Sequence, residues 1–143
     1  MYTINDLAVI TSLTTRTLRT YLKTGQLSGE KIDGVWQFDE EALDSFINNS
    51  SVRPSILAKH KAILFDFLND THKKTDAVCI TFDLPGSAEN AQEASRYFCE
   101  QVSKSDGGPL RFAFEETPTG GRGYLSGSPD TVLPMLNEYF RLR

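Results

Sequence analysis

A basic amphipathic segment, Leu13–Gly25, limits the architectures open to this 143-residue chain more than any other stretch. Leu18 and Leu22 are four residues apart, so they lie on one stripe of a predicted helix. The neighbouring stripe carries the basic residues of the segment, Arg16, Arg19 and Lys23. One side of this helix is therefore expected to pack in a core, and the other to face phosphate.

The ends of the predicted helix carry suitable capping residues. Thr14 or Thr15 is the expected N-cap, and Gly25 is the expected C-terminal stop. The preceding residues 2–10 predict a short amphipathic helix, with Ile4, Leu7 and Ala8 pointing inward. Two short helices joined by a tight turn fit a helix-turn-helix unit.

The next segments predict a hairpin and a further helix. Residues 26–38 read as a small β-hairpin because Asp33 and Gly34 supply a turn dipeptide that tolerates positive φ. Three acids at residues 39–41 suit the N-terminal end of a helix that closes near residue 50. Its core positions are Leu43, Phe46 and Ile47.

This order of elements resembles the DNA-binding domain of MerR-type transcriptional regulators and of the related excisionase-like winged helices. The residues that carry the resemblance are Tyr2-Thr3-Ile4, Leu7-Ala8, Leu13-Thr14, Arg16-Thr17-Leu18-Arg19, Tyr21, Gly25, Leu27, Gly34, Phe38 and Leu43. They lie within about the first 48 residues, and the run Arg-Thr-Leu-Arg-x-Tyr with its trailing Gly-x-Leu is the most specific part.

The resemblance implies that the second helix enters the major groove and that the hairpin, as a wing, contacts the DNA backbone. Arg16 and Arg19 are then expected to contact phosphates or a guanine edge. Thr15 and Thr17 are expected to reach phosphate or base. The complete set of expected DNA-binding residues is Thr14, Thr15, Arg16, Thr17, Arg19, Tyr21, Lys23, Lys31 and Trp36, in which Tyr21 and Lys23 hold the backbone.

Two positions depart from the family pattern. Thr20 stands where the family has a second aromatic residue beside Tyr21, and Trp36 stands where the wing has an arginine. Lys31 is therefore the only basic residue of the predicted hairpin. Trp36 is expected either to stack on a sugar or to pack under the wing, and packing is the commoner role of an isolated tryptophan.

Residues 51–75 predict a linking helix and a polar linker. The broad apolar face of the helix comprises Ile56, Leu57, His60, Ile63, Leu64, Phe67 and Leu68. The corresponding helix of MerR-type proteins is a long dimer-forming coiled coil, but about four turns are too few for a free-standing one. We expect this helix to pack on the following domain, or to pair with a second copy with that domain's help.

Residues 76–143 predict the element order βαββα. Strands are expected near residues 78–84, 110–114 and 122–126, and turns at residues 106–109 and 117–121. Both helices are expected on one face of this small sheet. The other face would carry Cys79, Thr81, Asp83, Arg111, Ala113, Glu115, Tyr124 and Ser126. Its small residues leave room for the linking helix, a second subunit or a ligand.

The net charge of −4 does not by itself favour a nucleic-acid partner, but its distribution matters more than its sum. The balance is −3 in residues 1–50, +3 in residues 51–75 and −4 in residues 76–143. All positive charge of the first segment lies between positions 16 and 31. A local basic face on an acidic protein binds DNA with a steep salt dependence.

Catalytic and metal-binding motifs are not recognisable. Cys79 and Cys99 are twenty residues apart without histidine partners, so free thiols are expected rather than a zinc site. Glu115 and Glu116 point to opposite faces of a strand, and no histidine lies in residues 76–143 to act with them. The Gly120–Gly123 run reads as part of a hairpin turn rather than an anion-binding loop. We expect no enzyme activity, no metal and no cofactor.

The sequence therefore predicts an α+β protein in three parts. These are a winged helix-turn-helix in residues 1–50, a linking helix and linker in residues 51–75, and a dimerisation or effector domain in residues 76–143. No apolar run reaches the roughly 18 residues of a membrane span, so the cytoplasm is the expected location. The expected function is a transcriptional regulator that binds double-stranded DNA as a homodimer.

Two other functions stay open at this point. One is a protein-interaction module in which the winged helix has lost DNA binding and the C-terminal sheet recruits a partner. The acidic balance and the missing wing arginine motivate this alternative. The other is a small effector that binds the sheet face and is coupled to DNA affinity, which requires reciprocity between the two ligands.

Overall fold

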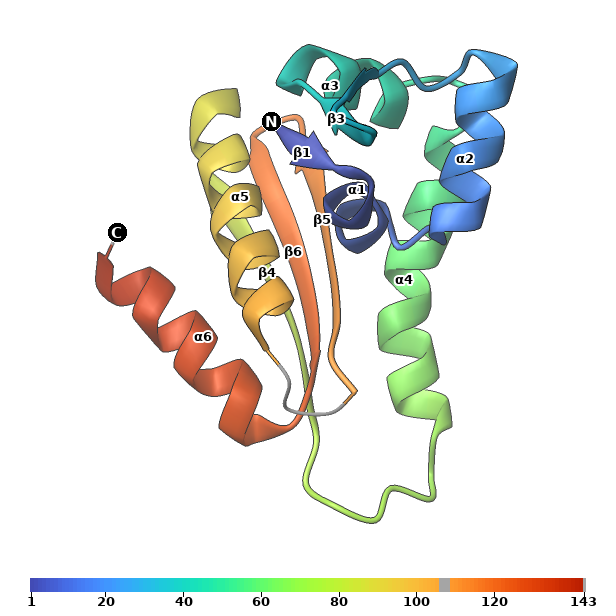
Figure 1. Ribbon diagram of the computed structural model, residues 1–143. Coiled ribbons are helices and arrows are strands. Elements are labelled where there is room, and N and C mark those ends of the chain that lie inside the picture. Colours follow the sequence, from blue (N-terminus) through green and yellow to red (C-terminus); the bar gives the residue numbers. More distant parts are fainter. Residues whose placement is uncertain (106–108, 143) are drawn as a thin grey trace. The chain divides into compact units, whose positions relative to one another are not determined.

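The computed structural model describes residues 1–105 and 109–142, and it divides the chain into two compact units (Figure 1). Unit 1 comprises Met1–Lys59 and unit 2 comprises His60–Arg143. The division falls within helix α4 (Arg53–Asn69), so each unit contains part of that helix. Helices together with two antiparallel three-stranded sheets agree with the predicted α+β class.

Unit 1 begins with a strand rather than a helix. Strand β1 (Tyr2–Thr3) pairs with β3 (Val35–Phe38), and helix α1 (Ile4–Thr11) follows at once. Thr3 caps α1, because its hydroxyl accepts from the N–H of Asp6 while the Asp6 carboxylate accepts from the N–H of Thr3. The prediction of a helix from residue 2 is wrong for these two residues, since an N-cap has extended backbone angles.

The predicted recognition helix is α2 (Thr15–Thr24), and helix α3 (Glu40–Ile47) follows the hairpin. Thr14 rather than Thr15 is the N-cap of α2. The core of unit 1 joins the apolar sides of the helices and strands: Tyr2, Leu7, Ile10, Leu13, Leu18, Leu27, Phe38, Leu43, Phe46, Ile47, Val52 and Ile56. Ile4 and Ala8, which the periodicity places inside, are only half-buried.

A tight hairpin joins β2 (Glu30–Ile32) to β3, and β3 is the central strand of the sheet. Its two turn residues have positive φ, 51° at Asp33 and 80° at Gly34. Positive φ at both central residues is the requirement of a type I′ turn, whose twist matches that of the strands it joins. The dipeptide seen in the sequence therefore forms the predicted hairpin.

Unit 2 contains a second sheet with helices packed on it. The strands β4 (Val78–Pro85), β5 (Arg111–Thr117) and β6 (Gly120–Gly127) lie in the order β4-β6-β5. Helices α5 (Ala88–Lys104) and α6 (Pro129–Leu142) lie on the same side of this sheet (Figure 1). The remainder of α4 contributes to the opposite face, where Ile63 is buried against Ala113 and Tyr124.

Glycines in β6 make room for aromatic rings beneath α5. A Cβ at Gly123 would lie 2.3 Å from the Phe82 ring, and one at Gly121 would lie 2.4 Å from the Phe114 ring. The Phe82 ring in turn contacts Phe98 of α5, with their centroids 5.2 Å apart. The glycine run is thus part of the core packing on this side of the sheet.

The turn before β6 is shorter than the sequence predicts. Only Pro118 and Thr119 form it, and β6 already begins at Gly120. A Cβ at Gly120 would lie 2.1 Å from the carbonyl oxygen of Leu84, so the two strands approach too closely there for a side chain. The prediction that the glycine run belongs to a turn is therefore wrong. The turn expected at residues 106–109 lies mostly outside the described residues.

Candidate nucleic-acid interface

Helix α2 presents its basic residues to solvent and its apolar residues to the core. Arg16, Arg19 and Lys23 are exposed, whereas Leu18 is fully buried. The three basic residues are three and four positions apart, so they line one stripe about two turns long. The buried leucine holds the helix in unit 1 and thereby fixes which stripe faces outward.

No carboxylate of the described chain forms an ion pair with these three side chains. None of the ion pairs described for this structure includes Arg16, Arg19 or Lys23. The first turn of α2 contains no acidic residue either, so its N-terminal dipole is not offset by a nearby negative side chain. The helix therefore combines three uncompensated cations with a free positive helix end, which is an arrangement suited to anions.

The threonines at the start of α2 form hydrogen bonds that cap the helix. The Thr14 hydroxyl accepts from the N–H of Thr17 at 3.1 Å and donates to the Thr17 hydroxyl at 3.0 Å. Thr15, the first residue of the helix, is half-buried. The N–H groups of Thr15 and Arg16 precede the first intrahelical hydrogen bond, which Leu18 donates to Thr14. These two amides are thus available to an external acceptor.

Tyr21 packs against the neighbouring helix. Its ring meets Phe46 of α3 edge-on, with a centroid distance of 5.3 Å and an interplanar angle of 67°. The side chain is half-buried. Edge-to-face pairs of this kind contribute about 0.5–1.5 kcal/mol beyond their buried area. Tyr21 therefore packs α2 against α3. The expected contact of Tyr21 with the DNA backbone would be made in addition to this packing.

The β2–β3 hairpin brings Lys31 and Trp36 together. They are direct cross-strand partners, and the Lys31 ammonium lies 5.9 Å from the centroid of the Trp36 ring. Trp36 is half-buried and stacks on the buried ring of Phe38, with the ring centroids 6.4 Å apart. Of the two expected roles of this tryptophan, the structure therefore shows packing under the wing. The hairpin thus presents a cation beside the position where the family pattern has an arginine.

Thr20 is an exposed polar residue of α2 outside the expected set of DNA-binding residues. It lies one turn after Arg16 on α2, and its hydroxyl donates to the Arg16 carbonyl at 3.2 Å. The i, i+4 spacing from Arg16 was the available signal. At this position an exposed hydroxyl stands in place of the second aromatic ring of the family pattern.

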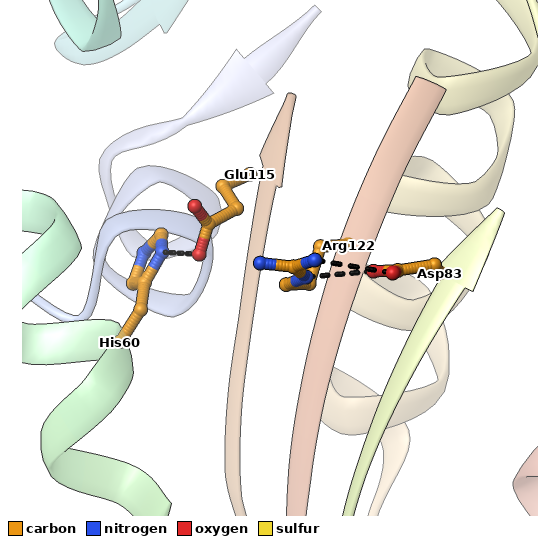
Figure 2. Close-up of polar contacts among 4 residues, drawn as sticks. All are labelled: His60, Asp83, Glu115 and Arg122. Carbon is orange, nitrogen blue, oxygen red and sulfur yellow. Dashed lines mark hydrogen bonds and ion pairs between the residues drawn. The ribbon is translucent and has the colours of Figure 1, made fainter. Parts of the chain in front are cut away.

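A row of charged side chains crosses the sheet of unit 2 (Figure 2). Arg122 on β6 faces Asp83 on β4 and Glu115 on β5 as cross-strand partners. The guanidinium donates from Nε to Asp83 Oδ1 at 2.6 Å and from Nη2 to Oδ2 at 3.1 Å. Figure 2 shows the Arg122 guanidinium between the Glu115 and Asp83 carboxylates.

His60 joins this row from helix α4. It is fully buried, and its Nδ1 lies 3.4 Å from Glu115 Oε1, a long contact for a hydrogen bond. Its ring also lies against Tyr124, with centroids 5.7 Å apart. Residues 76–143 contain no histidine of their own, as the sequence shows, and α4 supplies one to the Glu115 carboxylate from outside that range.

The surroundings of the row shift the acidity of its members. Burial raises the pKa of Glu115, but hydrogen bonds from His60 and Tyr124 and the charges of His60 and Arg122 together lower it below its ordinary value. Burial and the hydrogen bond to Glu115 raise the pKa of Tyr124 to about 12. The hydrogen bond from Arg122 lowers the pKa of Asp83. At neutral pH the row therefore holds ionised carboxylates, a charged guanidinium and a neutral phenol.

Comparison with known proteins identifies the N-terminal region. Residues 2–46 match the family model described as MerR HTH family regulatory protein. This span runs from β1 into α3 and covers less than half of the chain. Searches of curated proteins and of solved structures found no match.

The family match confirms the resemblance seen in the N-terminal residues, and it supports DNA binding and transcription regulation through a helix-turn-helix. It does not favour the alternative of a winged helix that has lost DNA binding. Within the two described ranges, no helix has the length and apolar character needed to cross a bilayer. Those ranges also contain no group of three or more His, Cys, Asp or Glu side chains placed to hold a metal ion.

Proposed function

We propose that unit 1 inserts helix α2 into the major groove of double-stranded DNA, and that the chain regulates transcription as a homodimer. The observation that carries the proposal is the exposed stripe of Arg16, Arg19 and Lys23, which no described carboxylate neutralises. It lies within the residues that match the MerR regulatory family. A DNA phosphate backbone offers the anions that this stripe lacks within the protein.

The proposed contacts divide into phosphate and base contacts. Arg16 and the free amides of the first turn of α2 bind phosphate, because the helix end there is positive. Arg19 lies one turn further along and reads a guanine edge, where a guanidinium donates two parallel hydrogen bonds. Lys23, in the last turn, binds phosphate on the far side of the groove.

The β2–β3 hairpin acts as a wing in this proposal. Lys31 supplies the cation that contacts the DNA backbone, and Trp36 holds the lysine from across the hairpin. The wing arginine of the family pattern is thus replaced by a lysine on the partner strand. A lysine makes a point contact rather than a forked one, so the wing contributes less than an arginine would.

A homodimer is proposed because helix-turn-helix regulators read paired half-sites. The part of α4 in unit 2 leaves two large apolar side chains open, Phe65 with 57% and Leu68 with 60% of their surface exposed. These residues are three positions apart and share one side of the helix. Pairing of two copies through this side would bury both.

The proposed function involves no catalytic step. In unit 2, the Asp83 carboxylate is held by Arg122 and the Glu115 carboxylate by His60 and Tyr124. We propose that these groups hold β4, β5, β6 and α4 together rather than acting on a substrate. An effector at this sheet would become part of the regulatory function only if it changed DNA affinity, and DNA changed effector affinity, by the same factor.

The test is selection of bound duplexes from a random pool at a low and a physiological salt concentration. The selected duplex should lose affinity steeply with salt, by about 0.9 in log K per log salt for each phosphate contacted. R16A/R19A should abolish binding of that duplex while leaving the circular dichroism spectrum unchanged.

The matched control is K104A/R141A, which removes two exposed cations of unit 2 that pair with Glu100 and Glu138. It changes the net charge by the same amount, and it should bind DNA like the wild type. Equal affinity of R16A/R19A and the wild type would overturn the proposal. Binding that does not respond to salt would do so as well.

A further inference from the structure

We propose that unit 2 binds a small carboxylic acid with an apolar body in the cavity between α4 and the β4–β6 pair. The cavity has a volume of about 280 Å³. Its lining includes Lys61 and Leu64 from α4, Thr81 and Asp83 from β4, and Arg122 and Tyr124 from β6. This ligand site goes beyond the proposed DNA binding of unit 1 and does not rest on it.

The cavity exists because α4 covers only part of this sheet face. Ile63 packs on Ala113 and Tyr124, which lie on the outer strand β5 and the central strand β6. On the other outer strand, β4, Thr81 and Asp83 remain exposed. The space between the helix and these residues is open to solvent on one side and closed by the sheet on the other.

The charges of the lining favour an anion. Lys61 has no acceptor or counter-charge among the described residues, and it is exposed at the cavity edge. Arg122 is bonded to Asp83 through Nε and Nη2, so these two charges offset one another and Nη1 takes no part in that pair. The lining therefore carries one net positive charge, and Lys61 is its source.

A neutral donor stands beside this charge. Thr81 carries a hydroxyl at the cavity, whereas the phenolic proton of Tyr124 is already donated to Glu115, so the sheet side adds one hydroxyl donor to the Lys61 cation. A carboxylate accepts hydrogen bonds only, and it matches this set of donors. The ionised carboxylate of Asp83 also lines this cavity. It would repel a ligand whose negative charge is spread over the whole molecule.

The helix side of the cavity accounts for the apolar body. Leu64 is half-buried and lines the cavity on the same helix as Lys61. An apolar group laid against the Leu64 side chain would remove its surface from water, at about 25 cal/mol for each Å². The volume is below that of common drug-sized sites, so the ligand is small.

A second, larger cavity of about 420 Å³ in unit 2 is less suited to an anion. Its three basic residues, Arg111, Lys73 and Lys74, are matched by three carboxylates in the same lining, those of Asp66, Asp70 and Asp76. Arg111 donates to Asp66 at 2.8 Å, and the Lys73 ammonium donates to the backbone carbonyls of Phe67 and Asp70. Lys61 differs from Arg111 and Lys73, because no described group accepts a hydrogen bond from its ammonium or forms an ion pair with it.

The test is a titration of the full ¹⁵N-labelled chain with benzoate, followed by the amide resonances of Thr81, Asp83 and Tyr124. These resonances should shift and saturate at millimolar benzoate. Benzyl alcohol, which has the ring without the charge, should bind about tenfold more weakly, the effect of losing one charge-assisted interaction. Acetate, which has the charge without the ring, should also bind about tenfold more weakly, because it buries less apolar surface. Inorganic phosphate should bind no better than acetate.

Lys61→Ala should weaken benzoate binding about tenfold by the same reasoning. Lys59→Ala, which removes an exposed lysine of the same helix outside the cavity, should leave it unchanged. Absence of saturable shifts at the three amides would overturn the proposal, as would equal affinity of Lys61→Ala and the wild type. Acetate or phosphate binding as tightly as benzoate would overturn the requirement for an apolar body. Because no arm contains DNA, loss of DNA binding by unit 1 would not alter any of these outcomes.

Discussion

Thr14 sets where the recognition helix begins, and its contribution is local. Its hydroxyl satisfies the N–H of Thr17, one of the amides that an α-helix leaves without an internal partner. The same residue stands in an extended conformation, which turns the chain from Leu13 in the core into α2. One hydroxyl thus connects the capping of the helix with the position of its basic stripe.

Thr14→Ala should lower the free energy of unfolding by about 1 kcal/mol, the usual cost of a lost N-cap. Urea unfolding followed by circular dichroism measures this value. Thr20→Ala is the control, because its hydroxyl bonds only back to the Arg16 carbonyl of its own helix. An equal loss in both variants would show that the cap contributes nothing specific.

Gly123→Ala should destabilise unit 2, because the added methyl group would lie 2.3 Å from the Phe82 ring. Overpacking of this kind costs about 1–3 kcal/mol. Thermal unfolding measures the loss, and the second substitution Phe82→Leu in the same chain should recover part of it by removing the ring. Failure of Phe82→Leu to recover any stability would mean that the clash is not the cause.

At the scale of elements, the β2–β3 hairpin and helix α2 carry unequal shares of the positive charge. The helix has three exposed basic residues and the hairpin has Lys31, which lies over Trp36. The type I′ turn at residues 33–34 fixes the register that makes these two residues partners. A shift of one residue would move Lys31 to the opposite face of the sheet.

Lys31→Ala should weaken DNA binding less than R16A/R19A and should lower the salt slope by about 1, as expected for one lost phosphate contact. Fluorescence anisotropy with the selected duplex at several salt concentrations gives the slope. Trp36→Phe, which keeps a ring beneath the lysine, should retain most of the affinity. A salt slope unchanged in Lys31→Ala would remove the hairpin from the interface.

The contact between α4 and β5 should make the stability of unit 2 depend on pH. Glu115 has a lowered pKa in the folded chain, in spite of its burial, because His60, Tyr124 and Arg122 face its carboxylate. Its contribution to stability is therefore complete above the unfolded pKa of about 4.3, and it is lost as the pH falls through the folded value. Glu115→Gln should be less stable than the wild type at pH 7.

The difference between Glu115→Gln and the wild type should shrink steadily as the pH falls from about 5 to 3. Chemical unfolding at a series of pH values measures it. Glu93→Gln, at an exposed position of α5, should follow the wild-type curve throughout. A constant difference across this range would mean that the carboxylate charge is not what holds α4 to the sheet.

At the scale of the whole molecule, the units have different proposed tasks and a shared helix. Unit 1 has a core of its own and bears the DNA-binding stripe, while unit 2 has a separate core and bears the exposed apolar side of α4. Pairing through unit 2 would place two copies of unit 1 in one particle. Two weakly binding helices would then act together, and their combined affinity would exceed that of either.

Phe65→Ser with Leu68→Ser should convert a dimer to a monomer, because polar side chains would replace the two exposed apolar ones on α4. Analytical ultracentrifugation measures the mass, and the same variant should bind a two-half-site duplex more weakly. Leu133→Ser with Leu142→Ser is the control, since these leucines are exposed on α6 instead. A wild-type chain that sediments as a monomer would contradict the proposed dimer directly.

The elements near the N-terminus were predictable because their signals are local. A threonine cap, an Asp-Gly turn and the periodicity of leucine and arginine are each read within a few residues. The errors have non-local causes. Tyr2 and Thr3 join a strand because β3, more than thirty positions later, offers them a partner, and the glycines of β6 belong to a strand because Phe82 and Phe114 require the space.

The sequence by itself determined which side of α2 is basic and where its helix starts and stops, because a 3.6-residue period and its caps depend only on neighbouring residues. Only the tertiary structure decided which residues meet across strands and helices. Periodicity assigns Asp83 and Glu115 to one sheet face, but the register of three strands places Arg122 between them and brings His60 to Glu115. Register depends on the packing of the whole sheet, so no short stretch of sequence contains it.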